Sequence, residues 1–219
     1  MKNRSYNQFC ALAYALDVVG ERWTLLIIRE LLAGPRRFTD LAAGLPGIST
    51  NLLSERLKGL EERGLLGRRV LPPPAGSTVY ELTPAGRALR VAVIELGRWG
   101  AQFLPAGLNG AALPSVGAIA LAIQAFFRPE QAEDLDETYE LRLGPERFQV
   151  QIKAGALRVH AGAALPAHAL FQADMGHFLG LFVGQIDPAE AIAGGLVRVE
   201  GDPAALSRFL DCVRPPQPA

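Results

Sequence analysis

Polar side chains line one face of a helix that is predicted to begin near Ser49. At 100° per residue, Asn51, Ser54 and Lys58 fall within roughly 60° of one another. Asparagine can pair bidentately with adenine, serine can bond to several base edges, and lysine can contact guanine or neutralise a phosphate. Any amphipathic helix has a polar face, so the meaning of this one depends on the elements around it.

Basic and hydroxyl side chains flank this helix in the sequence. Thr50 stands at its N-terminus, where the backbone N–H and the hydroxyl can meet a phosphate oxygen. Arg36 and Arg37 precede the helix, and Arg68 and Arg69 follow it. A charge pair is usually a solvated surface feature, but pairs on both sides of one helix suit anchoring to a nucleic-acid backbone.

The elements predicted around these residues come in a recognisable order. Helices over 9–19, 23–33 and 38–43 precede the helix at Ser49, and strand-like segments over 65–70 and 78–82 follow it. The loop over 72–77 is long enough to reach DNA, with Ser77 as its expected contact. Thr83 and Pro84 then cap a long helix to about Phe103. This is the order of a winged helix-turn-helix, whose helix after the turn enters the major groove.

The zero formal charge of the 219 residues hides an asymmetry. Residues 1–110 carry a net charge of +5 and residues 111–219 a net charge of −5. Helix breakers and turn formers over 104–110 indicate a domain boundary near residue 110. We therefore expect a DNA-binding and dimerisation domain over 1–110 and a second domain over 111–219.

The second half has the pattern of an α+β domain with an antiparallel sheet. An apolar helix over 115–128 precedes strands over 138–143, 147–153 and 156–161, which tight turns join into a meander. A strand over 170–173, helices over 175–182 and 188–193, a strand over 196–200 and a helix from Asp202 complete it. The whole chain is thus predicted to be α+β.

Several function classes have no signal in the sequence. Two distant cysteines and three histidines without ligand spacing predict no metal site, and a reducing cytoplasm is the expected location. No nucleophile elbow, phosphate loop or pair of catalytic carboxylates is present, so we expect no enzyme, no catalytic residues and no cofactor. Proline and polar residues interrupt the longest uncharged run, which argues against membrane insertion.

The first half carries recognisable sequence motifs, among them VGERWTLLIIR from Val19, GPRRF from Gly34, ISTNLLSERL from Ile48 and VYELTPAG from Val79. With these motifs, residues 7–103 resemble the HxlR family of bacterial transcription regulators, relatives of the MarR type. The resemblance implies a homodimer that binds a double-stranded DNA operator. Phe9, Tyr14, Trp99 and Phe103 suit a hydrophobic dimer seam, the alternative being packing against the second domain.

Cys10 has two interpretations. It aligns with the cysteine that some members of this family use to sense oxidants or electrophiles, which makes it a candidate redox sensor. Its neighbours Phe9, Ala11 and Leu12 are apolar, a setting more typical of a small buried hydrophobic residue. We expect the buried residue and keep the sensor as the alternative.

The motif GGLVRVEGD from Gly194, together with the elements before it, has a second likeness. Residues 115–213 resemble the sterol carrier protein type of lipid-binding domain. The resemblance implies a tunnel for a small apolar effector, with five candidate lining residues: Phe171, Met175, Phe178, Leu179 and Phe182. The alternative is that these side chains fill a core.

The favoured hypothesis is a homodimeric DNA-binding regulator whose second domain senses a ligand. The alternative is a lipid or small-molecule carrier, or sequestering protein, that uses its helical half for dimerisation. An enzyme with an unrecognised site ranks third.

Overall fold

The computed structural model describes residues 5–72, 76–105, 112–162 and 166–215. The chain divides into two compact units, Met1–Val93 and Ile94–Ala219. The boundary that we expected near residue 110 lies outside the described residues. The division between the units falls within helix α6 (Arg90–Gly100).

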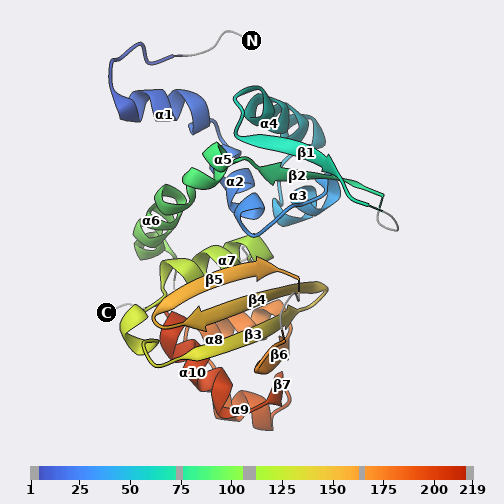
Figure 1. Ribbon diagram of the computed structural model, residues 1–219, viewed down its shortest axis with the longest axis vertical. Coiled ribbons are helices and arrows are strands. Elements are labelled where there is room, and N and C mark those ends of the chain that lie inside the picture. The colour runs from blue at the N-terminus through green and yellow to red at the C-terminus, as the bar shows by residue number, and fades with distance from the viewer. Residues whose placement is uncertain (1–4, 73–75, 106–111, 163–165, 216–219) are drawn as a thin grey trace. The chain divides into compact units, whose positions relative to one another are not determined.

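The N-terminal unit is a winged helix-turn-helix, as the order of its predicted elements indicated (Figure 1). Four helices precede a two-stranded wing and a short fifth helix. Their bounds are α1 Ala11–Val19, α2 Thr24–Leu32, α3 Phe38–Gly44, α4 Thr50–Glu62, β1 Leu66–Val70, β2 Thr78–Leu82 and α5 Pro84–Ala88.

Helix α4 forms where the cap and the leucine spacing predicted it. The Leu52 N–H donates to Ser49 Oγ at 3.3 Å, which satisfies one of the unpaired donors of the first turn. Leu53, Leu57 and Leu60 are buried along one side of the helix. The polar side of α4 is therefore left facing away from the core of this unit.

The wing is an antiparallel pair in which Leu66 lies opposite Leu82 and Val70 opposite Thr78. The tip of its loop, residues 73–75, lies outside the described residues. Arg36 and Tyr80 form an isolated bridge, because each donates its N–H to the other's carbonyl at 3.0 and 2.8 Å. The segment between α2 and α3 is thereby attached to the wing strand β2.

The prediction of one long helix from Thr83 to Phe103 is wrong in one respect, because the helix is interrupted at Leu89. The cap is confirmed, since Thr83 Oγ1 accepts from Gly86 N–H at 3.2 Å. The Leu89 N–H then bonds to Gly86 O, three residues back, and this tight turn separates α5 from α6, which ends in the 3-10 turn Ala101–Phe103. Gly86 is pressed against Leu65, whose carbonyl oxygen would lie 2.0 Å from an added Cβ. This contact holds α5 against the wing.

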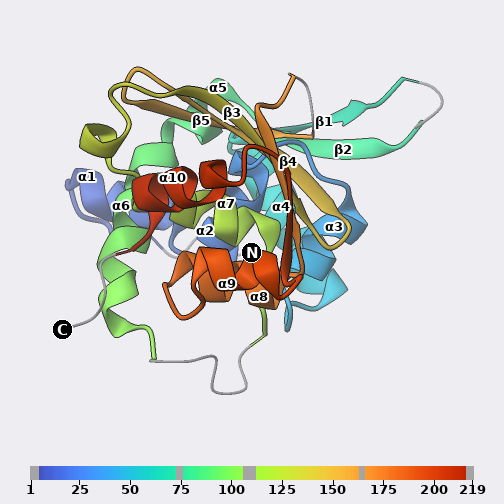
Figure 2. The ribbon, with the colours of Figure 1, turned by 90° about the horizontal axis from the view of Figure 1, so that it is seen from below.

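The C-terminal unit is a five-stranded sheet with helices on one face (Figure 2). The strand order is β5-β4-β3-β6-β7, antiparallel throughout except for the parallel pair β3 and β6. Its elements are α7 Val116–Ala125, the 3-10 turn Pro129–Gln131, β3 Asp136–Leu143, β4 Glu146–Lys153, β5 Ala156–Ala161, β6 Ala169–Ala173, α8 Met175–Phe182, α9 Pro188–Ala193, β7 Val197–Gly201 and α10 Ala204–Val213.

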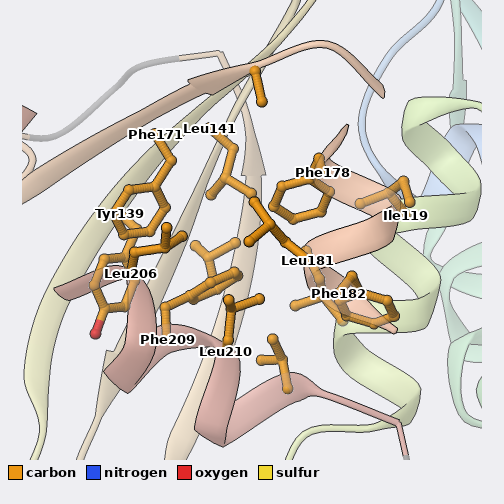
Figure 3. Packing of buried hydrophobic residues seen from close by; sticks show 14 of the residues in the cluster. Ile119, Tyr139, Leu141, Phe171, Phe178, Leu181, Phe182, Leu206, Phe209 and Leu210 are labelled. Carbon is orange, nitrogen blue, oxygen red and sulfur yellow. The ribbon is translucent and has the colours of Figure 1, made fainter. Parts of the chain in front are cut away.

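Aromatic rings fill the centre of this unit (Figure 3). The Phe209 ring of α10 lies edge-on to Tyr139 at 5.1 Å between centroids and tilted against Phe171 at 5.7 Å. Phe178 and Phe182 of α8 stack at 6.3 Å. Such pairs add to the free energy gained by burying apolar area, so this cluster holds the sheet and helices together.

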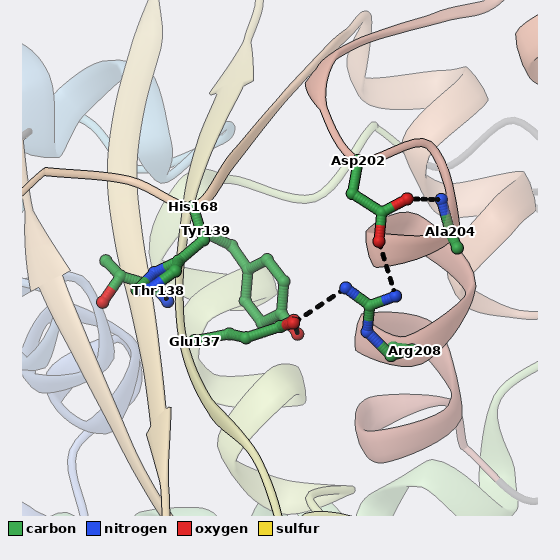
Figure 4. Close-up of polar contacts among 7 residues, drawn as sticks. All are labelled: Glu137, Thr138, Tyr139, His168, Asp202, Ala204 and Arg208. Carbon is green, nitrogen blue, oxygen red and sulfur yellow. Dashed lines mark hydrogen bonds and ion pairs between the residues drawn. The ribbon is translucent and has the colours of Figure 1, made fainter.

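A polar network fastens α10 to the edge of this cluster (Figure 4). Glu137 on β3 accepts from the Tyr139 hydroxyl at 2.5 Å and from Arg208 Nη2 at 2.7 Å. Arg208 Nη1 also donates to Asp202 at 2.8 Å. Burial opposes the ionisation of Glu137, but the hydrogen bonds from Tyr139 and Arg208 hold its pKa below the ordinary value.

Candidate nucleic-acid interface

The candidate base-reading residues lie together on the exposed side of α4. Asn51, Ser54 and Lys58 are all exposed, and Thr50 is exposed at the first position of the helix. The leucines on the other side fix α4 to the core of its unit. A capped helix with three such side chains in a row has the form of a recognition helix.

Three of the candidate cations have carboxylate partners. Lys58 Nζ lies 3.7 Å from Glu62 Oε1. Arg68 Nη2 pairs with Glu61 at 2.8 Å, and Arg69 Nε pairs with Glu81 at 3.1 Å. The side chains of the first pair are mostly exposed and those of the other two pairs are 35–50% exposed, and ion pairs at the surface contribute only about 0–1 kcal/mol each. A phosphate can therefore replace the carboxylate at little cost.

The arginine pair before α3 has two different roles. The Arg36 backbone is bonded to Tyr80, and its side chain is half-buried. The Arg37 side chain is exposed, while its backbone N–H donates to Asp40 Oδ2 at 3.0 Å and so helps to cap α3. The guanidinium of Arg37 is thus presented to solvent at the N-terminus of the helix that precedes the turn.

The expected wing contact through the Ser77 hydroxyl does not agree with the structure. Ser77 Oγ is buried and has no hydrogen-bond partner among the described residues. The Ser77 carbonyl accepts from the Leu71 N–H at 2.9 Å, which closes the base of the loop. This hydroxyl is therefore not available to a phosphate.

Arg56 is a further residue of this region that the sequence reasoning missed. Its side chain is only 16% exposed, and Nη1 pairs with Glu21 at 2.7 Å and with Glu55 at 2.8 Å. Its Nε donates to the Arg22 carbonyl at 3.2 Å. Arg56 thus attaches α4 to the turn between α1 and α2. Its position next to the buried Leu57 on an amphipathic helix was the one sign in the sequence that Arg56 contacts other parts of the fold.

The two cysteines differ in exposure. Cys10 is exposed at the start of α1, so the expectation of a buried residue was wrong. The apolar residues around it do not cover it, because Phe9 and Leu12 are themselves exposed. Cys212 is buried, and burial raises the pKa of its thiol to about 11. A thiol with so high a pKa is a poor nucleophile.

The candidate effector residues form part of the core of the C-terminal unit. Phe171, Phe178 and Phe182 are buried against other apolar side chains, whereas Met175 and Leu179 are only partly buried. None of the five residues lines either of two hollows, of about 600 and 340 Å³, in the described part of the chain. The three phenylalanines are therefore part of the packed core in this structure.

The described residues contain neither a cluster of metal-binding side chains nor a helix suited to a membrane. No group of three or more histidine, cysteine, aspartate or glutamate side chains in residues 5–215, gaps aside, is arranged to hold a metal ion. None of the described helices has the length and apolar character needed to cross a membrane.

The N-terminal part of this chain is similar in sequence to known proteins. The family model of the HxlR-like helix-turn-helix matches residues 18–107. The HTH-type transcriptional regulator YodB of Bacillus subtilis is 40% identical over 93 residues, which cover 42% of this chain and 83% of YodB. YvaP of the same organism, an uncharacterized HTH-type transcriptional regulator, is 39% identical over 90 residues, 41% of this chain and 83% of YvaP. This chain belongs to the HxlR-like helix-turn-helix family.

The remainder of this HxlR-like chain matches a second family. The model of the SCP-2 sterol transfer family covers residues 122–211.

The uncharacterized HTH-type transcriptional regulator Rv3095 of Mycobacterium tuberculosis is 48% identical over 91 residues, which are 42% of this chain and 57% of Rv3095. A solved structure of reduced YodB shares 38% identity, covers 46% of this chain and 99% of that chain, and has a TM-score of 0.39.

Proposed function

We propose that this HxlR-like protein is a homodimeric transcriptional regulator that reads its operator with α4. The observation that carries the proposal is the exposed row of Asn51, Ser54 and Lys58 on a capped helix beside a basic wing. Membership of a helix-turn-helix family supports it, and the relatives are named as regulators.

In this proposal each side chain of the interface has a role. Asn51 pairs with an adenine edge, Ser54 bonds to a neighbouring base, and Lys58 contacts guanine or a phosphate. The N-terminus of α4 at Thr50 binds a phosphate oxygen. Phosphate contacts also come from the basic side chains around the helix, namely Arg36, Arg37, Arg68 and Arg69.

Exposed apolar side chains support the homodimer. Phe9, Leu12 and Tyr14 are exposed on or next to α1. Trp99 and Phe103, at the end of α6 and in the turn after it, are 60% and 66% exposed, with ring centroids 5.0 Å apart. Exposed aromatic clusters of this kind mark interfaces. A two-fold dimer would set two recognition helices about one DNA turn apart, roughly 34 Å.

Introducing a negative charge at Trp99 tests the proposed dimer seam. In the Trp99→Glu protein we expect the dimer dissociation constant to rise about tenfold or more, because an aromatic anchor is lost and a carboxylate is buried. Sedimentation over a range of concentrations measures it. Arg158→Glu, at an exposed position on β5, is the control and should leave the dimer intact. An unchanged dissociation constant for Trp99→Glu would contradict the seam.

The second domain is proposed to modulate DNA binding through an apolar ligand. Its match to the SCP-2 sterol transfer family supports an apolar ligand class. Helix α6 is packed on α7, since Arg98 Nε donates to the Ala125 carbonyl at 2.8 Å and a Cβ added to Gly97 would lie 3.2 Å from Leu121. A ligand that shifts α7 would shift the Trp99 end of the proposed dimer helix and so change operator affinity.

A second candidate function is a carrier of apolar molecules, which the SCP-2 match also favours. Mobility-shift measurements with the promoter regions of its own and neighbouring genes separate the two functions. Tight, sequence-specific binding supports the regulator. Weak binding that moderate salt abolishes, and that ignores sequence, supports the carrier.

The exposed Cys10 offers a separate test of regulation. If it is a redox sensor, peroxide or an electrophile should lower the operator affinity of the wild-type protein and leave that of Cys10→Ser unchanged. The buried Cys212 is present in both proteins and serves as an internal control. Equal affinities before and after treatment in both proteins would end the sensor hypothesis.

A further inference from the structure

We propose that Glu55 is a specificity-determining residue that accepts a hydrogen bond from the N4 amino group of a cytosine in the operator. This inference rests on the proposed function, because it requires α4 to lie in the major groove. Among the acidic side chains, only those on the groove-facing side of α4 can contribute, and cytosine N4 is the base-edge donor that carboxylates recognise.

Glu55 lies within the row of candidate base readers. Relative to Asn51, it is rotated by roughly 40° about the helix axis, whereas Lys58 is at roughly −20° and Ser54 at roughly −60°. The buried leucines Leu53 and Leu57 lie on the opposite side. Glu55 therefore projects at least as directly from the core as Ser54 does, and its side chain is 43% exposed.

The carboxylate of Glu55 is already oriented. Oε1 accepts from Arg56 Nη1 at 2.8 Å. Arg56 is itself held by Glu21 and by the Arg22 carbonyl. The second carboxylate oxygen of Glu55 has no partner among the described residues, so one acceptor remains for a base. An acceptor held by a fixed arginine loses less conformational entropy on binding than a free side chain would.

The surroundings leave room for this contact. Glu55 and Lys58 border the hollow of about 600 Å³ between α4 and the segment that joins α1 to α2, which Val18, Glu21 and Thr24 line on the other side. Neither side chain is enclosed there, since 43% of the Glu55 side chain and 73% of the Lys58 side chain are exposed.

A carboxylate at this position has two opposite effects on DNA binding. It is repelled by phosphates wherever the facing base offers no donor, and it is stabilised where a cytosine amino group meets it. Loss of Glu55 should therefore strengthen binding to unrelated DNA and weaken discrimination at one base pair. A residue that only supports Arg56 would change affinity for all sequences in the same direction.

The experiment starts from duplexes that the wild-type protein selects from random-sequence DNA. In the Glu55→Ala protein we expect one position of the selected site to lose its C·G preference, by about tenfold, while affinity for unrelated DNA rises or stays constant. Glu62→Ala is the matched control, because it removes an equal charge from the same side of α4 and frees Lys58. It should raise affinity for all duplexes and keep the preference.

Two results would overturn the proposal. One is an unchanged base preference in Glu55→Ala, and the other is an equal loss of affinity for every duplex. If Glu55→Ala unfolds, Glu55→Gln keeps an oxygen for Arg56 and must still reduce the C·G preference. A wild-type protein that selects no sequence would instead refute the proposed function, which separates the two failures.

Discussion

The Asn51→Ala protein is expected to bind its selected operator about tenfold to a hundredfold more weakly than the wild type, with little change in its affinity for unrelated DNA. Asn51 is exposed at the second position of α4 and is not part of the core, so its removal should leave the fold intact. An asparagine amide can both donate to and accept from one adenine, and alanine offers neither bond.

Titration of both duplexes at several salt concentrations measures this effect. The slope of affinity against salt should stay the same, because Asn51 neutralises no phosphate. Gln185→Ala, which removes an exposed amide from the C-terminal unit, is the control and should bind as the wild type does. If Asn51→Ala weakens binding to all sequences equally, Asn51 does not read a base.

Removal of the Phe209 ring should cost the C-terminal unit about 3–5 kcal/mol of its free energy of unfolding. Phe209 is fully buried between Tyr139 and Phe171, and alanine would leave a cavity where three rings now meet. Since native proteins are stable by only about 5–15 kcal/mol, this loss is a large fraction of what such a unit can have.

Calorimetry of the full chain tests this expectation. The transition of the C-terminal unit should fall sharply in temperature in Phe209→Ala, while binding to unrelated DNA by the N-terminal unit persists. Tyr6→Ala removes an aromatic ring from an exposed position outside the proposed seam and should leave that transition in place. Loss of both transitions together would show that the two compact units do not unfold independently.

Elements with strong local signals were predicted closely from the sequence. Helices α8 and α9 have the expected bounds, and Asp174 and Asp187 cap their N-termini with side-chain hydrogen bonds. The helix at Ser49 and the wing strand Thr78–Leu82 were found for similar reasons. A cap or an alternation of apolar residues acts over a few neighbours, and the sequence displays it directly.

Features that depend on distant contacts could not be predicted in this way. The break at Leu89 accompanies the contact of Gly86 with Leu65 O, and the parallel pairing of β3 with β6 joins strands that are some way apart in the chain. The candidate interface likewise has one part that the sequence predicts and one part that it does not. The exposed row on α4 follows from helical periodicity, but the clamp of Arg56 on Glu21 needs the tertiary fold.

The packing of α6 on α7 bears on how the two family domains were joined. The HxlR-like match extends to residue 107, yet the second compact unit already begins at Ile94. Helix α6 therefore begins in the first unit and ends in the second. A chain cut after residue 105 would keep α6 but strip Gly97 and Arg98 of their partners Leu121 and Ala125. A DNA-binding half isolated in that way would therefore expose the side of α6 that packs on α7 in the whole chain.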